Sequence, residues 1–92
     1  MIVYISIGNS DDKLTQREWS RFVIAVAAEV VSIGKLHGTW FSVPQSPWQN
    51  ACWCVEFLSQ KDADEAKIIA KQIRSEYQQD SIAWAVADTE FV

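Results

Sequence analysis

The order in which two hydrophobic periodicities follow one another constrains the fold of this chain more than any other feature. β-branched and alternating apolar stretches are typical of strands, whereas apolar residues spaced three and four apart are typical of a helix. The expected strands cover residues 2–7, 36–43, 51–58 and 81–87, and the expected helices cover about 15–33 and 62–78. The order is therefore strand, helix, strand, strand, helix, strand.

Local signals mark where several of these elements begin and end. Thr15 and Glu18 form a capping box, in which the Thr15 hydroxyl accepts from the Glu18 backbone N–H and the Glu18 carboxylate reaches back to Thr15. Gly34 suits the left-handed residue that closes a helix. The acidic residues 62–65 offer a cap for the second helix. Pro44 cannot donate to a strand ladder, so we expect it to end the second strand.

This order within 92 residues predicts a single α+β domain with the ferredoxin-like fold. In that fold a four-stranded antiparallel sheet carries both helices on one face. The handedness rule for crossover connections leaves few other topologies. The helices would cover one face of the sheet and leave the other bare. We call this bare side the open face, and we expect function to lie there.

Glu56 decides which side chains point to the open face. A carboxylate beneath the helices would cost several kcal/mol unless it were paired, so Glu56 belongs outside. Alternation along the strands then assigns to the open face Ile2, Tyr4, Ser6, Gly38, Trp40, Ser42, Cys52, Cys54, Glu56 and Leu58. The side chains expected under the helices are Val3, Ile5, Ile7, Phe41, Val43, Trp53, Val55 and Phe57. In the last strand, either Ile82, Trp84 and Val86 or the alanines between them could face the helices. We favour an outward Trp84.

Two of the strands resemble the RNA-recognition motif family. Residues 3–8, with Tyr4 at the stacking position, resemble that family's first-strand motif, and the Val-Glu-Phe ending of residues 51–57 resembles its third-strand motif. In this chain, however, both third-strand stacking positions are cysteines, and Asn50 stands where the family has a basic residue. The net charge of −4 also opposes phosphate binding. The resemblance supports the face assignment, and we expect no nucleic acid as partner.

Aromatic side chains on the open face suggest a binding surface. In a hairpin joined by residues 44–50, Trp40 would lie across from Cys54 and Ser42 across from Cys52. An apolar strip of this kind is typical of an interface or a ligand groove. The candidate binding residues are Tyr4, Trp40, Ser42, Trp48, Gln49, Asn50, Cys52, Cys54, Glu56 and Trp84. Alternatively, Trp48 and its loop fold over the sheet and close the strip.

Three functional hypotheses remain open. The first is a small acidic non-enzymatic module that binds a protein partner or a second copy of itself, as regulators and inhibitors do, phage-encoded antagonists of host systems among them. The second is a small-ligand binder or a cofactor-free enzyme, because dimeric ferredoxin-like monooxygenases resemble this layout; Asn50, Trp48 and His37 would then be the site residues. The third is a degraded RNA-recognition module.

Charge and cysteine content indicate where the protein is located and which partners it does not bind. Twelve acids against eight bases oppose binding to an anionic membrane, and no apolar run approaches the roughly 18–20 residues of a membrane span. Two cysteines, 52 and 54, form no disulfide framework, so we expect a cytoplasmic protein. We expect no metal and no cofactor. Zinc needs about four ligands, and alternation puts His37 opposite the thiols unless Gly38 marks a bulge.

Overall fold

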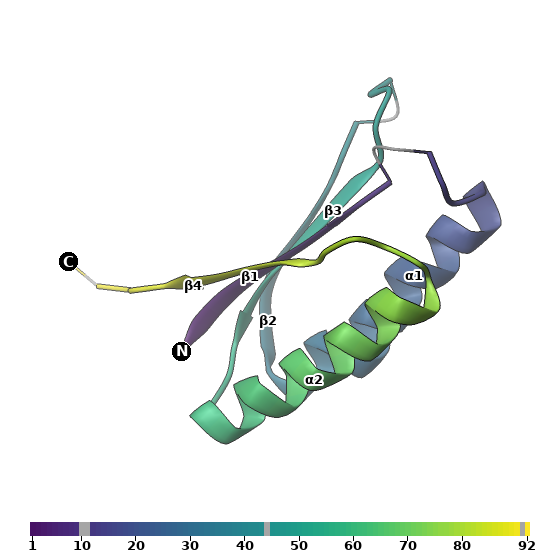
Figure 1. Cartoon of the computed structure of the whole chain (residues 1–92). Coiled ribbons are helices and arrows are strands. Elements are labelled where there is room, and N and C mark those ends of the chain that lie inside the picture. Colours follow the sequence, from purple (N-terminus) through teal and green to yellow (C-terminus); the bar gives the residue numbers. More distant parts are fainter. Residues whose placement is uncertain (10–11, 44, 91) are drawn as a thin grey trace.

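Four strands form one antiparallel sheet in the order β2-β3-β1-β4, and both helices lie on the same side of it (Figure 1). The computed structural model describes residues 1–9, 12–43, 45–90 and 92. Its elements are β1 Ile2–Gly8, α1 Gln16–Glu29, the short 3-10 helix η1 Val31–Ile33, β2 Lys35–Phe41, β3 Asn50–Glu56, α2 Gln60–Glu76 and β4 Ala83–Ala87. This is the expected ferredoxin-like βαββαβ architecture in two layers.

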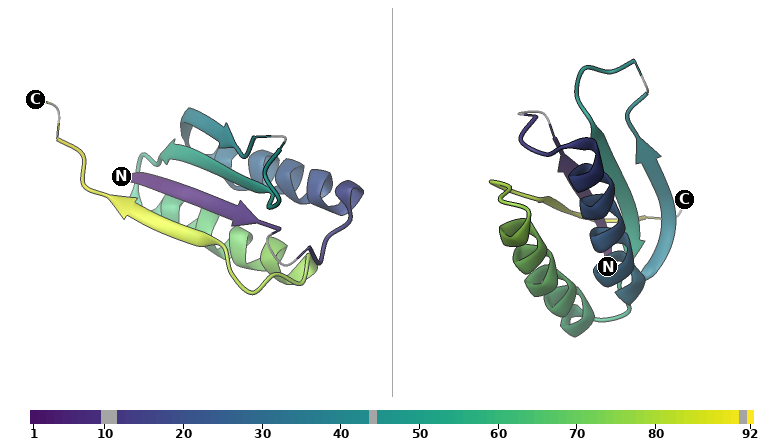
Figure 2. Two further views of the ribbon diagram at one scale, coloured as in Figure 1. Left: turned by 90° about the horizontal axis from the view of Figure 1, so that it is seen from above. Right: turned by 90° about the vertical axis from the view of Figure 1, so that its right-hand side faces the viewer.

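The two helices form a layer against one face of the sheet (Figure 2). The hydrophobic core consists of side chains from the helices and from the covered face of the sheet. Alternate residues of β1 and β3 point into it, as predicted, and Glu56 points away from it. The largest fully buried side chains are Phe22, Phe57, Ile5, Val3, Val26, Val30 and Val55. Since a side chain of this size contributes roughly 1.5–3 kcal/mol when it is fully buried, this single layer supplies most of the driving force for folding.

The start of α1 is fixed by the predicted capping box and by a buried asparagine. The Thr15 hydroxyl accepts from the Glu18 backbone N–H at 3.2 Å, and the Thr15 N–H donates to the Glu18 carboxylate at 3.0 Å. Just before this cap, the Asn9 side chain accepts from the Leu14 N–H and donates to the Leu14 carbonyl, both at 3.0 Å. Together these bonds provide partners for backbone polar groups in the segment that leads from β1 into α1.

Two helix boundaries differ from the sequence prediction. The cap of α2 is Ser59, whose hydroxyl accepts from the Asp62 N–H, so the helix begins before residues 62–65 rather than at them. Gly34 is extended, with φ −110°, so it is not the left-handed residue we expected. A glycine is needed there for space, because a Cβ would lie 2.6 Å from the Glu56 carbonyl oxygen. Pro44 and the polar turn residues Ser10 and Asp11 lie outside the described residues.

The pairing of β2 with β3 also differs from the prediction. A β-bulge lies between Leu36 and Gly38, so Gly38 pairs with Cys54 and Trp40 pairs with Cys52. The predicted face of Trp40 is correct, but the predicted partner is wrong by two residues. Ser42 lies beyond the end of β2 and therefore does not pair with Cys52.

The helices do not extend over β2. Leu36 and Phe41 are exposed on this strand, and Val43 is exposed just after it. We expected Phe41 and Val43 to be covered, and that expectation is wrong: η1 contacts β2, but both of these side chains remain exposed. The strands β2 and β3 and the connection between them form a hairpin. Apolar side chains of β2 are exposed on both faces of this hairpin.

Trp84 lies on the side opposite to the one we favoured. In the antiparallel pairing of β1 with β4, Trp84 is the partner of the buried Ile5, and Ala85 is the partner of the exposed Tyr4. The Trp84 ring stacks on Phe57, with centroids 5.9 Å apart. The alanines of β4 therefore face outward, and Trp84 packs under α2 instead of joining the open face.

Candidate functional site

The centre of the open face is a stacked pair of exposed rings. Tyr4 on β1 and Trp40 on β2 have ring centroids 6.4 Å apart with an interplanar angle of 29°. They are 40% and 54% exposed, respectively. Because β3 runs between β1 and β2, the two rings meet above β3. We call these two residues the ring pair.

The ring pair covers the thiol of Cys54. Cys54 is the β3 partner of both Tyr4 and Gly38, so its side chain lies on the open face beneath the rings. It is nevertheless only 7% exposed, whereas Cys52 is half-buried. A hydrogen-bonding contact with the Cys54 thiol raises the pKa of the Tyr4 phenol.

Gly38 makes room for the Trp40 indole. A Cβ at Gly38 would lie 2.7 Å from Cη2 of the Trp40 ring, which is closer than van der Waals contact. The indole therefore lies back over the glycine, toward Tyr4, instead of standing away from the sheet. The sequence contained this signal, a glycine two residues before an outward tryptophan, but only the register of β2 reveals its use.

A hydrogen-bonded histidine and glutamate border the ring pair at one end of the sheet. The bulge turns His37 toward Glu56, and His37 Nε2 lies 2.8 Å from Glu56 Oε1. Both side chains are about 40% exposed. The hydrogen bond from His37 lowers the pKa of Glu56. His37 therefore lies on the open face, as the sequence analysis expected if Gly38 marked a bulge. Its ring bonds to the Glu56 carboxylate rather than to the thiols.

The other end of the open face continues into the hairpin. Trp48 is 57% exposed, so the loop does not fold down to close the face, and its ring belongs to the exposed surface. The Ser46 hydroxyl donates to the Trp48 carbonyl and accepts from the Trp48 N–H. Ser42 and Asn50 hold the strands together through bonds of 3.0 and 3.1 Å. A hollow of about 300 Å³ beside Trp40 and Cys52 lies at this end.

Gln49 belongs to the support of the hairpin rather than to the rim of the open face. Its side-chain oxygen accepts from Asn9 Nδ2 at 3.0 Å and from Gln16 Nε2 at 3.2 Å. Its side-chain nitrogen donates to Gln16 at 2.8 Å. These bonds join the base of the hairpin to the start of α1.

The residues proposed for an enzyme site do not converge. His37 binds Glu56 at one end of β3, whereas Asn50 stands at the other end of that strand. Six residues of strand separate the two ends, which is roughly 20 Å. Within the described ranges, no group of three or more potential metal ligands comes together. The open face carries the ring pair near its centre and the His37–Glu56 hydrogen bond at one end.

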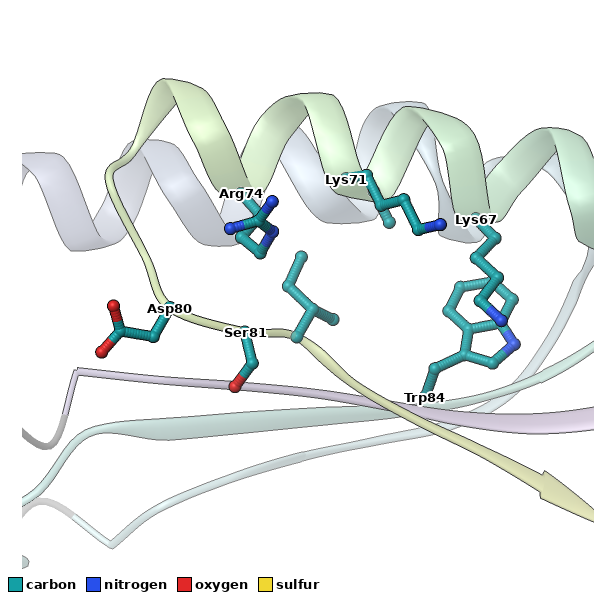
Figure 3. A pocket seen from close by; sticks show the side chains of 8 residues that line it. Lys67, Lys71, Arg74, Asp80, Ser81 and Trp84 are labelled. Carbon is teal, nitrogen blue, oxygen red and sulfur yellow. The ribbon is translucent and has the colours of Figure 1, made fainter.

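A second site, which the sequence analysis did not select, lies on the other side of the sheet. Lys67, Lys71 and Arg74 of α2 line a cavity of about 220 Å³, together with Trp84 of β4 (Figure 3). Cations at positions i, i+4 and i+7 share one helix face. That spacing was visible in the sequence, but the inward Trp84 that completes the site was not.

In the part of the chain that the structure describes, neither helix is long and apolar enough to cross a membrane. Comparison of the chain with protein-family models, with curated proteins and with solved structures gives no match.

Proposed function

We propose that this chain is a non-enzymatic interaction module that binds protein through the open face and the hairpin, with a second copy of the chain as the first partner to test. The observation that carries the proposal is the ring pair. Two large aromatic side chains are held stacked in solvent at the middle of an uncovered sheet. Tyr and Trp at the centre of a surface are the residue types that contribute most to protein binding.

The charges on the open face favour a protein surface over a charged ligand. Lys35 is the β2 register partner of Glu56, which puts opposite charges on neighbouring strands, and the Glu56 carboxylate bonds to His37. Other side chains assigned to the face are apolar, hydroxyl or thiol groups. Depletion of charge at the centre with polar groups at the rim is typical of protein interfaces. Two copies could approach through this face without bringing like charges together, although each carries a net charge of −4.

The size of the face indicates that the hairpin takes part. Four strands of five to seven residues, at roughly 4.8 Å between strands and 3.3 Å per residue, offer roughly 400 Å². A stable interface buries about 800 Å² on each partner. The sheet alone is too small, so Phe41, Val43 and Trp48 on the exposed hairpin would supply the remaining contact area.

Light scattering across a concentration series tests the proposal. We expect the wild-type chain to associate and Trp40→Ala to weaken association at least 30-fold, with a smaller loss for Trp48→Ala. Ile24→Ala is the matched control, because Ile24 is an equally exposed apolar residue on α1, away from the open face. A wild-type chain that stays monomeric at high micromolar concentration contradicts self-association. Equal effects of Trp40→Ala and Ile24→Ala contradict the role of the ring pair.

A further inference from the structure

The two edges of the sheet differ in how well they are protected against another strand. An edge strand offers a row of unpaired N–H and C=O groups, and proteins block such rows with charges, prolines or bulges. The β2 edge carries Lys35 and the bulge between Leu36 and Gly38. The β4 edge, Ala83–Ala87, has no charge, proline or register shift. Residues 88–90 lead away from the sheet and leave this edge open (Figure 2).

A basic groove runs beside this open edge. Lys67, Lys71 and Arg74 of α2 line it, and Trp84 of β4 lies below Lys67 (Figure 3). Ala70 and Ile82 complete the apolar floor. Neither lysine forms an ion pair with a described residue. Arg74 is held at one end by a 3.1 Å bond from its guanidinium to the Gln79 carbonyl.

The charge of the groove opposes that of the whole chain. Three of the eight basic residues are gathered here in a protein with a net charge of −4. The carboxylate that lines the groove, Asp80, lies at its end, 3.7 Å from Lys13 Nζ. The middle of the groove is therefore positive, and it would attract carboxylates into a place where an apolar floor also lies exposed.

We propose that β4 is a strand-addition site for an extended acidic segment of another protein. The segment would pair with the outer edge of β4 through its backbone. Because successive side chains of a strand alternate between faces, every second residue would point toward α2. Carboxylates at those positions would meet Lys67, Lys71 and Arg74, and one apolar side chain among them would rest on Ile82 and Trp84. Backbone pairing would give affinity and the charges would give specificity.

The same charges argue against a second copy at this edge. Two chains that paired β4 with β4 about a twofold axis would keep their helices on the same side of the joined sheet. Their α2 helices would then be neighbours, with the two rows of cations facing each other. Such like-charge contact is unfavourable. This site is thus separate from the open face, where self-association would bring no such charges together.

A fluorescein-labelled synthetic peptide tests the acidic preference. The probe is a seven-residue peptide with Glu at positions 1, 3 and 7, Val at position 5 and Thr between them, followed by fluorescence anisotropy at low salt. We expect saturable binding that Lys71→Glu weakens at least tenfold and that Lys61→Glu changes less than twofold. Lys61 is the matched control, because it lies on the same helix but outside the groove. Equal binding of a peptide with Lys in place of Glu would overturn the proposal.

Two N-methylated versions of the peptide test backbone pairing. Methyl groups on one alternate set of amides remove the donors that face β4, whereas methyl groups on the other set remove donors that face solvent. We expect one version to lose binding at least tenfold and the other to keep it. Equal binding of both would show that the groove takes the carboxylates as a simple anion site, and the proposal would fail. Protection of β4 amides from exchange in a peptide-free dimer would assign the edge to a second copy and would also overturn it.

Discussion

The two faces of the sheet carry stacked ring pairs of similar geometry and opposite fate. Phe57 and Trp84 stack at 5.9 Å beneath the helices, and Tyr4 and Trp40 stack at 6.4 Å on the open face. Phe57 is 1% exposed, whereas Trp40 is more than half exposed. One sheet supplies both pairs from different strands: Tyr4 is on β1 and Trp40 on β2, whereas Trp84 is on β4 and Phe57 directly follows β3. The difference shows that cover by α1 and α2, not the sheet itself, decides whether an aromatic pair stabilises the fold or remains available to a partner.

The largest expected effect is a difference in folding stability between a substitution in the Phe57–Trp84 pair and one in the ring pair. Phe57→Ala removes a fully buried ring and leaves a cavity, so we expect it to lower the free energy of unfolding by about 3–5 kcal/mol. Trp40→Ala removes a larger ring from the open face, and we expect a loss below about 1 kcal/mol. Urea unfolding followed by circular dichroism measures both. Similar losses from the two substitutions would show that the open face is part of the core and would end the comparison.

A smaller effect is expected when the exposed pair is displaced but not removed. Gly38→Ala places a methyl group where the Trp40 indole lies, so the ring must swing away from Tyr4 and uncover Cys54. We expect the unfolding free energy to change by less than about 1 kcal/mol, since the end of a surface side chain can move at low cost. The rate of Cys54 alkylation by iodoacetamide should rise several-fold, with Cys52 as the internal reference. An unchanged Cys54 rate would mean that the ring pair does not shield the thiol.

The smallest effect concerns acid stability at the edge of the open face. The hydrogen bond from His37 lowers the pKa of Glu56. The resulting stabilisation is present above the ordinary glutamate pKa of about 4.3 and is lost as the pH falls through the lowered value in the folded state. We expect Glu56→Gln to flatten the decrease of Tm in this range slightly. His37→Ala should flatten it equally, and the double variant should add nothing further. Additive changes would contradict the pairing.

The fold could be predicted because its strongest signals are local. The capping box at Thr15 and the alternation of β1 and β3 act within a few residues, and one carboxylate, Glu56, was enough to orient β3. The errors arose where distant packing decided. The bulge at His37 changed the register of β2. Trp84 stacks on Phe57 on the covered face, although the alternation of β4 allowed either face.

The candidate site was predicted in part. Tyr4, Trp40, Cys52 and Cys54 were placed on the correct face by parity alone, since parity survives a register error of two residues. Three features could not be predicted: the shielding of the Cys54 thiol, the exposure of β2 and the hydrogen bonds by which Gln49 anchors the hairpin. Each depends on how far a helix or a side chain reaches across the sheet, which no residue spacing encodes.

The amide links at the base of the hairpin have a consequence for binding thermodynamics. Asn9 is 3% exposed and bonds to Leu14 and Gln49, while Gln49 also bonds to Gln16. A hairpin without these hydrogen bonds would lose conformational entropy when a partner immobilised it. Here that ordering takes place during folding, so the bound shape of the hairpin's base is already preorganised and association is spared much of the entropic penalty. If the open face binds a partner as proposed, its affinity would depend in part on a buried amide, Asn9, that lies outside the contact surface.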